Sequence, residues 1–231
     1  MSISPREPAP LSFFHAGPAP RASGPRRGGL RDGLNLQPGM AVGLFGGSFN
    51  PAHDGHAHVA ETAMRRLGLD RVVWLVSPQN PLKDARDSAP LAERMASARV
   101  AARHAASGPS MIVSDVETRI GVRWTVDTLR ALTARHPGVR FVWLMGSDNL
   151  ADFHRWRGWT DIMRLMPVAV IARPGSMLDS RTAPAAARFA GARVPAGRAR
   201  LLADMEAPAW TYLTAPLNPR SSTAIRAQRM S

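Results

Sequence analysis

Apolar runs with the character of strands alternate with helical stripes from residue 40 to the end of the chain. The run RVVWLVS at 71–77 is apolar at every position but its ends, which is typical of a strand covered on both faces. The stretch 91–106 repeats its apolar side chains every three or four residues, which indicates a helix with one buried face. This alternation predicts a single α/β domain in which helices cover both faces of a Rossmann-like, doubly wound parallel sheet.

The same two patterns give the expected bounds of the individual elements. Strands are expected at 40–46, 71–77, 110–117, 139–146, 167–175 and 209–215. Helices are expected at 56–68, 91–106, 125–136, 158–165 and 182–191, and a last one begins at Ser221 or Ser222. In a sheet of this kind ligands bind beyond the carboxyl ends of the strands, so functional residues are expected directly after strands.

The first 39 residues differ from the rest of the chain. They contain seven prolines and six glycines and show no periodic apolar pattern, so they cannot bury enough surface to offset the entropy of ordering. We therefore expect residues 1–39 to be a disordered extension and residues 40–231 to be the domain. A transit peptide stays open because the segment carries arginine and few acids, but LSFF is too short for the apolar core of a secretory signal.

The charge and the cysteine content narrow the class of protein. Thirty Lys and Arg residues against 17 Asp and Glu give a net charge of +13, which favours nucleotides, nucleic acid or acidic surfaces as partners. The chain has no cysteine, which excludes disulfides and thiolate metal sites. No apolar run approaches the roughly 20 residues that a membrane span needs. We expect a cytoplasmic protein with no membrane partner.

Two glycines follow the first expected strand, in the stretch GLFGGSFNPAHDGH at 43–56. Gly46 and Gly47 lack Cβ atoms, so their backbone N–H groups can approach a ligand closely. The stretch matches neither the GxxxxGK[ST] pattern of a P-loop nor the GxGxxG pattern of dinucleotide-binding folds.

Histidines surround the start of the next helix. We expect that helix to begin near Gly55 with Asp54 as its N-cap, which places His53 and His56 where free N–H groups and the helix dipole favour an anion. A zinc site formed with His58 is an alternative. However, no carboxylate lies at an HExxH position and His58 should point away from the other two, so we interpret it as a structural or surface residue. The pattern predicts a phosphate-binding turn.

These residues carry a family resemblance. GGSFNPAHDGH resembles the GGSFxPxHxGH signature of the nucleotidyltransferase superfamily, in which two histidines stabilise the phosphates of a nucleoside triphosphate, and SSTAIR at 221–226 resembles its second motif. The resemblance implies that His53, His56, Lys83 and Arg226 are the catalytic residues. The ATP-binding residues that it implies are Gly46, Gly47, Ser48, Phe49, His53, His56, Arg173, Ser221, Ser222, Thr223 and Arg226.

The second motif also has a physical reading of its own. Ser222 and Thr223 open a helix, so their hydroxyls and N–H groups converge on an anion. Arg226 follows one turn later and can reach the same phosphates through its fork of donors. An ordinary serine N-cap followed by a surface arginine is the alternative for this segment taken alone.

The middle of the chain narrows the family. The segments VETRIGVRWTVDTL, LMGSDNLADFHRWRGW, IARPG, PLKD and LAERMAS resemble segments of the nicotinate- and nicotinamide-nucleotide adenylyltransferases, and the bacterial nicotinate enzymes are the most similar. The resemblance spans residues 40–227. It implies that Trp156 stacks on the pyridine ring, with Arg157 beside it, and that Asp148 contacts the ribose or helps to hold the site. The mononucleotide-binding residues that it implies are Ser48, Lys83, Trp124, Thr125, Asp148, Trp156 and Arg157.

Not every tryptophan is expected in the pocket, and two positions depart from the family pattern. Trp74 and Trp143 lie within expected strands, so we interpret both as core residues. Asn50 stands where the family usually has Asp, and Arg123-Trp124 stands where it usually has Ser-Tyr. The second departure changes one wall of the pyridine pocket.

The resemblance implies adenylyl transfer from ATP to nicotinate mononucleotide, giving nicotinate adenine dinucleotide and pyrophosphate, a reaction of NAD biosynthesis. It also implies Mg²⁺ that is carried with ATP, with no metal site of the protein's own. A related transfer to nicotinamide mononucleotide or phosphopantetheine is one alternative. A basic nucleic-acid-binding protein is another, but it would explain only the charge, so no specific nucleic-acid partner is expected. A homo-oligomer stays open.

Overall fold

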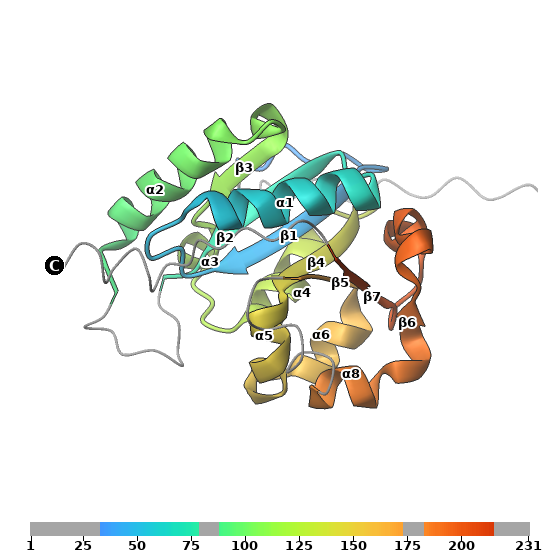
Figure 1. Cartoon of the computed structure of the whole chain (residues 1–231). Coiled ribbons are helices and arrows are strands. Elements are labelled where there is room, and N and C mark those ends of the chain that lie inside the picture. Colours follow the sequence, from blue (N-terminus) through green and yellow to red (C-terminus); the bar gives the residue numbers. More distant parts are fainter. Residues whose placement is uncertain (1–32, 79–87, 173–182, 215–231) are drawn as a thin grey trace, which may run out of the picture. The chain divides into compact units, whose positions relative to one another are not determined.

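Seven parallel strands form the centre of the computed structural model, which describes residues 33–78, 88–172 and 183–214. The strands are β1 (Ala41–Gly47), β2 (Arg71–Val76), β3 (Met111–Ser114), β4 (Arg140–Gly146), β5 (Val168–Ile171), β6 (Arg193–Val194) and β7 (Trp210–Leu213). Their order in the sheet is β3-β2-β1-β4-β5-β7-β6, and each described pair is parallel (Figure 1). The α/β prediction is confirmed.

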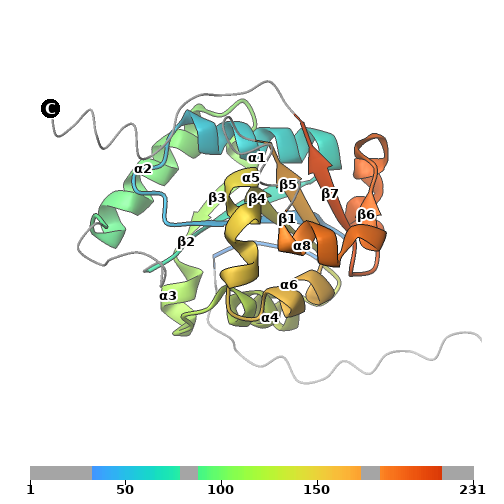
Figure 2. The ribbon, with the colours of Figure 1, turned by 60° about the horizontal axis from the view of Figure 1, so that its bottom comes forward.

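The helices lie on both faces of this sheet. They are α1 (Asp54–Leu67), α2 (Leu91–His104), α3 (Val116–Ile120), α4 (Thr125–Arg135), α5 (Ser147–Asp152), α6 (Trp159–Leu165) and α8 (Pro184–Arg188). Figure 2 shows α1 and α2 on one face of the sheet and α4 and α6 on the other. Each face has its own apolar core, because strand side chains alternate between the two faces.

The direction of winding places a switch point between β1 and β4. The chain runs from β1 outward through β2 to β3 and then returns to the other side of β1 to form β4. The loops that leave the carboxyl ends of β1 and β4 therefore diverge, and this is where doubly wound sheets bind their ligands. The candidate site residues after Gly47 and after Gly146 lie on the connections, including the first turns of α1 and α5, that leave these two strands.

The structure differs from the expected elements in several segments, and it adds the short helices α3 and α5. The strand expected at 110–117 ends at Ser114, whose Oγ accepts the N–H of Val116 across 3.2 Å and so turns the chain into α3. The helix expected at 182–191 is shorter and is followed by a 3-10 turn. The short strand β6 and the 3-10 helix Ala196–Asp204 were not predicted, since both are too short or too irregular to show a clear period.

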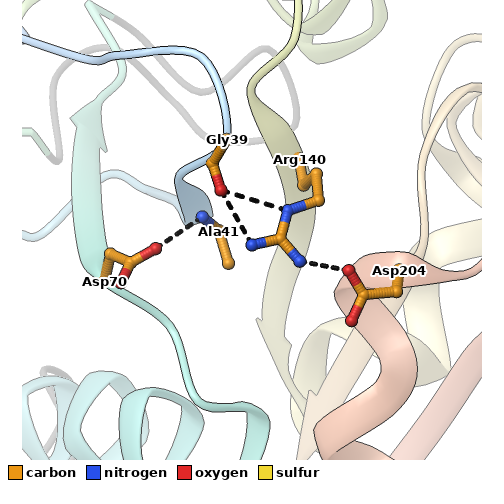
Figure 3. Close-up of polar contacts among 5 residues, drawn as sticks. All are labelled: Gly39, Ala41, Asp70, Arg140 and Asp204. Carbon is orange, nitrogen blue, oxygen red and sulfur yellow. Dashed lines mark hydrogen bonds and ion pairs between the residues drawn. The ribbon is translucent and has the colours of Figure 1, made fainter.

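The amino ends of the strands are fixed by the polar contacts that Figure 3 shows. Asp70 Oδ2 accepts the N–H of Ala41 across 2.8 Å, and the Asp70 N–H donates to the Ala41 carbonyl across 2.9 Å. The guanidinium of Arg140 donates to the Gly39 carbonyl and pairs with the Asp204 carboxylate. The amino ends of β1, β2 and β4 are thus occupied by structural bonds.

The folded domain begins before residue 40. Leu34 is fully buried in the core that contains α4 and α6, and Arg71 Nη1 donates to the carbonyls of Leu34 and Asn35 across 3.2 and 3.0 Å. Residues 34–39 therefore belong to the domain, which corrects the boundary expected at 40. Most of the expected extension lies outside the described residues.

Candidate active site

The start of α1 is capped by two histidines. His53 is the N-cap, and its Nδ1 accepts the N–H of Gly55 across 3.0 Å. The Nδ1 of His56 accepts the N–H of His53 across 3.3 Å. This is a capping box in which imidazoles take the places that Ser and Glu usually fill. The prediction that Asp54 is the N-cap is wrong, because the His53 ring occupies that role. Asp54 is the first residue of the helix, and its side chain is exposed.

The capping box fixes the proton on each ring. A nitrogen that accepts an N–H carries no hydrogen, so a neutral imidazole bonded through Nδ1 carries its proton on Nε2. His53 and His56 are therefore both Nε2–H donors, and their ring centroids are 4.0 Å apart. His53 is buried and His56 is half-buried. The helix N-terminus thus carries two paired imidazole donors beside the backbone N–H groups of its first turn.

Phe49 shapes the turn between β1 and α1. Its side chain is buried, and its ring stacks on Trp74 with 5.2 Å between the centroids. It also makes edge-to-face contacts with the rings of Phe45 and His56, with 5.5 and 5.0 Å between the centroids. Its φ is +46°, a left-handed conformation that costs a non-glycine residue roughly 1–2 kcal/mol. Any contact of Phe49 with ATP would therefore come from its backbone, and its ring fixes the turn by packing.

Packing against Trp143 requires glycine at residue 46, and this reason is separate from the expected approach of a ligand. A Cβ added to Gly46 would lie 2.3 Å from Cη2 of Trp143 on β4, so the bare backbone makes room for that ring. A Cβ on Gly47 would meet the Phe49 ring at 3.1 Å, which is tight but less severe. Trp143 and Trp74 are almost wholly buried, which confirms that both are core residues.

Trp143 also joins the two halves of the candidate site. It packs against Gly46 near the end of β1. It also makes an edge-to-face contact with the half-buried Trp156, with 6.3 Å between the ring centroids. Phe153 holds Trp156 from another side at 5.4 Å. The expected phosphate-binding turn and the expected pyridine-stacking residue are therefore neighbours through one buried indole.

Two arginines lie over Trp124, which precedes α4. The Cζ atoms of Arg123 and Arg157 are 5.1 and 5.2 Å from the centroid of its ring, and both arginines are exposed. Such contacts attract a guanidinium to an aromatic face and hold it in place. Arg157 was expected beside the pyridine pocket, and Arg123 joins it in this cluster. Thr125 begins α4 and is half-buried.

Two buried charged side chains were not singled out from the sequence. Arg94 is 3% exposed, and burial lowers its pKa. Glu117 is 7% exposed, and burial raises the pKa of its carboxyl to about 7, although Thr128 Oγ1 donates to it across 3.1 Å. The sequence carries a signal for Arg94, since it lies three residues after Leu91 and one before Met95, within the apolar stripe of α2.

Several expected site residues fall elsewhere. Asp148 is the second residue of α5 and is exposed after β4, as a residue beyond a strand end should be. Lys83, Arg173, Ser221, Ser222, Thr223 and Arg226 lie outside the described residues. Within the described ranges, no three His, Cys, Asp or Glu side chains lie together as metal ligands would, and no helix there is long and apolar enough to cross a membrane.

Comparisons with known proteins agree with this arrangement. The model of the cytidylyltransferase-like family matches residues 44–228. A protein of Caulobacter sp. (strain K31), named probable nicotinate-nucleotide adenylyltransferase, is 66% identical over 190 residues, which are 82% of this chain and 98% of the relative. The chain belongs to the nicotinate-nucleotide adenylyltransferase family. A family member of the same name from Roseobacter denitrificans is 52% identical over 200 residues, 86% of this chain and 98% of the relative.

Solved structures extend the likeness to the fold. The Plasmodium falciparum nicotinic acid mononucleotide adenylyltransferase complexed with APC has a TM-score of 0.60 and 15% identity, with coverage of 81% of this chain and 83% of its own. The same protein complexed with NaAD gives a TM-score of 0.59. These structures confirm the fold, and the relatives and the family model confirm the family prediction. The two histidines of the capping box of α1 are the two histidines of the family signature.

Proposed function

We propose that this chain transfers the adenylyl group of ATP to nicotinate mononucleotide, which yields nicotinate adenine dinucleotide and pyrophosphate in NAD biosynthesis. The names of relatives at 52–66% identity support the acceptor. The capping box of His53 and His56 is the observation that carries the transfer itself. It places two imidazoles at a helix N-terminus, with His56 half-buried and the Nε2 of His53 enclosed beside it, an arrangement suited to the phosphates of ATP.

The reaction is an in-line displacement at the α-phosphorus. A phosphate oxygen of the mononucleotide forms the new P–O bond, and the bond from the α-phosphorus to its bridging oxygen breaks. That electron pair leaves with pyrophosphate, so no covalent enzyme intermediate is needed. Positioning and charge stabilisation then account for the catalysis. Because backbone hydrogen bonds already fix both imidazoles, their donors need no reorganisation as negative charge develops.

The remaining phosphate contacts come from residues that the family motifs identify. Lys83 and Arg226 are proposed to bind the phosphates of ATP, with Arg173, Ser221, Ser222 and Thr223 as further ATP contacts and Ser48 and Phe49 as backbone contacts. Mg²⁺ would enter with the ATP substrate, since Mg²⁺ in such sites is held largely by phosphate oxygens. When bound, it supplies neutralisation of charge on the leaving pyrophosphate.

The acceptor side is proposed to lie at Trp156. Its ring is half-buried, and the exposed part of the ring would stack on pyridine. The guanidiniums of Arg123 and Arg157 lie over Trp124. Two positive charges in this cluster favour the anionic pyridine carboxylate of nicotinate over the neutral amide of nicotinamide. Thr125 and Asp148 would complete the pocket, with Asp148 on the ribose.

The test is the formation of dinucleotide from ATP with nicotinate and nicotinamide mononucleotides in parallel. We expect dinucleotide to form only when ATP and a mononucleotide are both present. The kcat/KM should be higher for nicotinate mononucleotide than for nicotinamide mononucleotide. CTP in place of ATP and phosphopantetheine in place of the mononucleotide are the controls. Product with phosphopantetheine alone would assign a different acceptor. Absence of turnover together with nucleic-acid binding that falls steeply with salt would reject the enzyme altogether.

A further inference from the structure

Arg94 is a buried arginine whose partners are all backbone carbonyls. Its Nε donates to Ala89 across 2.9 Å, and its Nη2 donates to Pro78 across 2.8 Å. Its Nη1 donates to both Ser48 and Ser77, across 2.9 and 2.7 Å. Four hydrogen bonds from one charged group in a nearly dry site are strong, since low local dielectric strengthens charge-assisted bonds.

These carbonyls come from three separate segments at the carboxyl edge of the sheet. Ser48 lies in the turn after β1, Ser77 and Pro78 follow β2, and Ala89 precedes α2. Arg94 therefore ties the expected phosphate-binding turn to the exit of β2 and to the start of α2. It also bonds to one residue before the segment 79–87, Pro78, and to one residue after it, Ala89.

Two more side chains reinforce this tie. Asn50 Oδ1 accepts the N–H of Ala89 across 3.1 Å, so Ala89 is held through both its N–H and its carbonyl. Ser97 Oγ accepts the N–H of Ala52 across 3.2 Å and donates to the Arg94 carbonyl across 2.9 Å. Residues 48–52 are thus bonded at three points to α2 or to the residue Ala89 shortly before it, through Ser48, Asn50 and Ala52.

The bond to Ser48 fixes a donor direction. In a trans peptide the carbonyl and the following N–H point opposite ways, so a Ser48 carbonyl directed at Arg94 turns the Phe49 N–H away from it. Ser77 and Ala89 are each followed by a proline, which has no backbone N–H, so the bonds of Arg94 to their carbonyls do not orient a following donor. Phe49 also has the strained φ of +46°, and such a conformation persists only where its surroundings impose it.

From these contacts we infer that Arg94 is a positioning residue for ATP, acting through Ser48 and Phe49. It keeps the turn after β1 in the strained form in which the Phe49 N–H points away from Arg94, and we infer that this N–H meets phosphate together with His53 and His56. This role rests on the proposed function, since it assumes that the turn receives phosphates. Lysine cannot replace the arginine, because an ammonium has three donors and lacks the planar fork that reaches four carbonyls.

The test compares Arg94→Lys and Arg94→Ala with the wild type, with Arg99→Ala as the matched control on the exposed side of the same helix. Circular dichroism and thermal unfolding establish that each variant is folded. We expect the KM for ATP to rise at least about tenfold in both Arg94 variants, while the KM for the mononucleotide stays near that of the wild type. Arg99→Ala should change neither constant.

Added guanidinium separates positioning from general stability. At concentrations far below those that unfold proteins, guanidinium ion should restore part of the ATP affinity of Arg94→Ala and leave the wild type and Arg94→Lys unimproved. Equal changes in both KM values, or a folded Arg94→Ala variant with wild-type ATP affinity, would overturn the inference. Arg94→Lys carries the same comparison if the alanine variant does not fold.

Direct titration of ATP by calorimetry keeps the two proposals apart. ATP affinity does not depend on which acceptor the protein uses, so a wild type that binds ATP but makes no dinucleotide would reject the acceptor and leave the Arg94 comparison intact. An ATP affinity that is the same in the wild type and both Arg94 variants would reject the role of Arg94, whatever the acceptor.

Discussion

The Nδ1 of His56 accepts the backbone N–H of His53 across 3.3 Å, while the two rings lie 4.0 Å apart between centroids. One imidazole therefore serves the helix through one nitrogen and can serve a ligand through the other. The two roles depend on different chemistry, because capping needs an acceptor and phosphate binding needs a donor. Substitutions at His56 can separate them.

His56→Ala should lower kcat for dinucleotide formation by roughly 10²–10³, the usual loss when one transition-state donor is removed. His56→Glu keeps an acceptor at the third helical position, as ordinary capping boxes do, but supplies no donor. We expect both variants to be slow and the glutamate variant to melt at the higher temperature. Steady-state kinetics and thermal unfolding of the two variants check this.

His58→Ala is the control on the same helix. The Nε2 of His58 is buried and has no hydrogen-bond partner among the described residues. Its removal should change packing without changing kcat. A His56→Ala enzyme as fast as the wild type would exclude that histidine from the mechanism, and a slow His58→Ala enzyme would show that kcat responds to any change in α1.

Glu117 should make stability depend on pH. Burial raises the pKa of its carboxyl from the ordinary 4.5 to about 7 in the folded state, so the native protein keeps a proton that the unfolded chain releases. Between these two values unfolding releases that proton, so its contribution to stability is lost as the pH rises. The slope is at most ~1.4 kcal/mol per pH unit, and it vanishes above about pH 7. Urea unfolding at several pH values measures it.

Glu117→Gln isolates this contribution. The amide stays neutral and still offers an oxygen to Thr128 Oγ1, which donates to Glu117 across 3.1 Å. The free energy of unfolding of the variant should lack the fall between about pH 4.5 and 7 that the wild type shows. If the difference between the two proteins is the same at every pH, then Glu117 does not titrate in this window.

Gly46→Ala should destabilise the domain by about 1–3 kcal/mol, the usual cost of overpacking. The new Cβ would lie 2.3 Å from Cη2 of Trp143, and that ring is too deeply buried to move aside. Gly197→Ala is the matched control, because a Cβ there meets nothing within 4 Å. Denaturant unfolding compares the two. A Gly46→Ala protein as stable as the control would contradict the packing of Trp143 described above.

Lys83 is the only lysine of the chain, so an amine-reactive reagent has a single side chain to modify. This allows its proposed contact with phosphate to be tested. Lys83→Arg should lower kcat/KM for ATP although charge is kept, because a compact ammonium and a planar guanidinium bind phosphate differently. An amine-reactive reagent should inactivate the wild type more slowly when ATP is present. The Lys83→Arg protein supplies the control for reaction at the chain's amino terminus. Inactivation at the same rate with and without ATP would separate Lys83 from the phosphates.

Much of the fold follows from local pattern. The strand predicted at 71–77 is β2, which is one residue shorter. The prediction succeeds because a short run of apolar residues is typical of a strand that is buried on both faces. The helix predicted at 125–136 is α4 almost to the residue. The failures have local causes, as at Ser114, where one hydroxyl bond ends a strand that hydropathy alone would continue. Leu34 escaped prediction because a single anchoring side chain has no period.

The sequence by itself determined the alternation of strands and helices, and with it the family motifs and the position of His53 and His56 at the start of α1. Those features depend on neighbours a few residues apart. Only the tertiary structure decided that His53 rather than Asp54 caps the helix, that Trp143 occupies the space left by Gly46, and that Arg94 binds Ser48. Each of these depends on which atoms of the folded chain reach one another, and the strongest of them join segments that lie far apart along the chain.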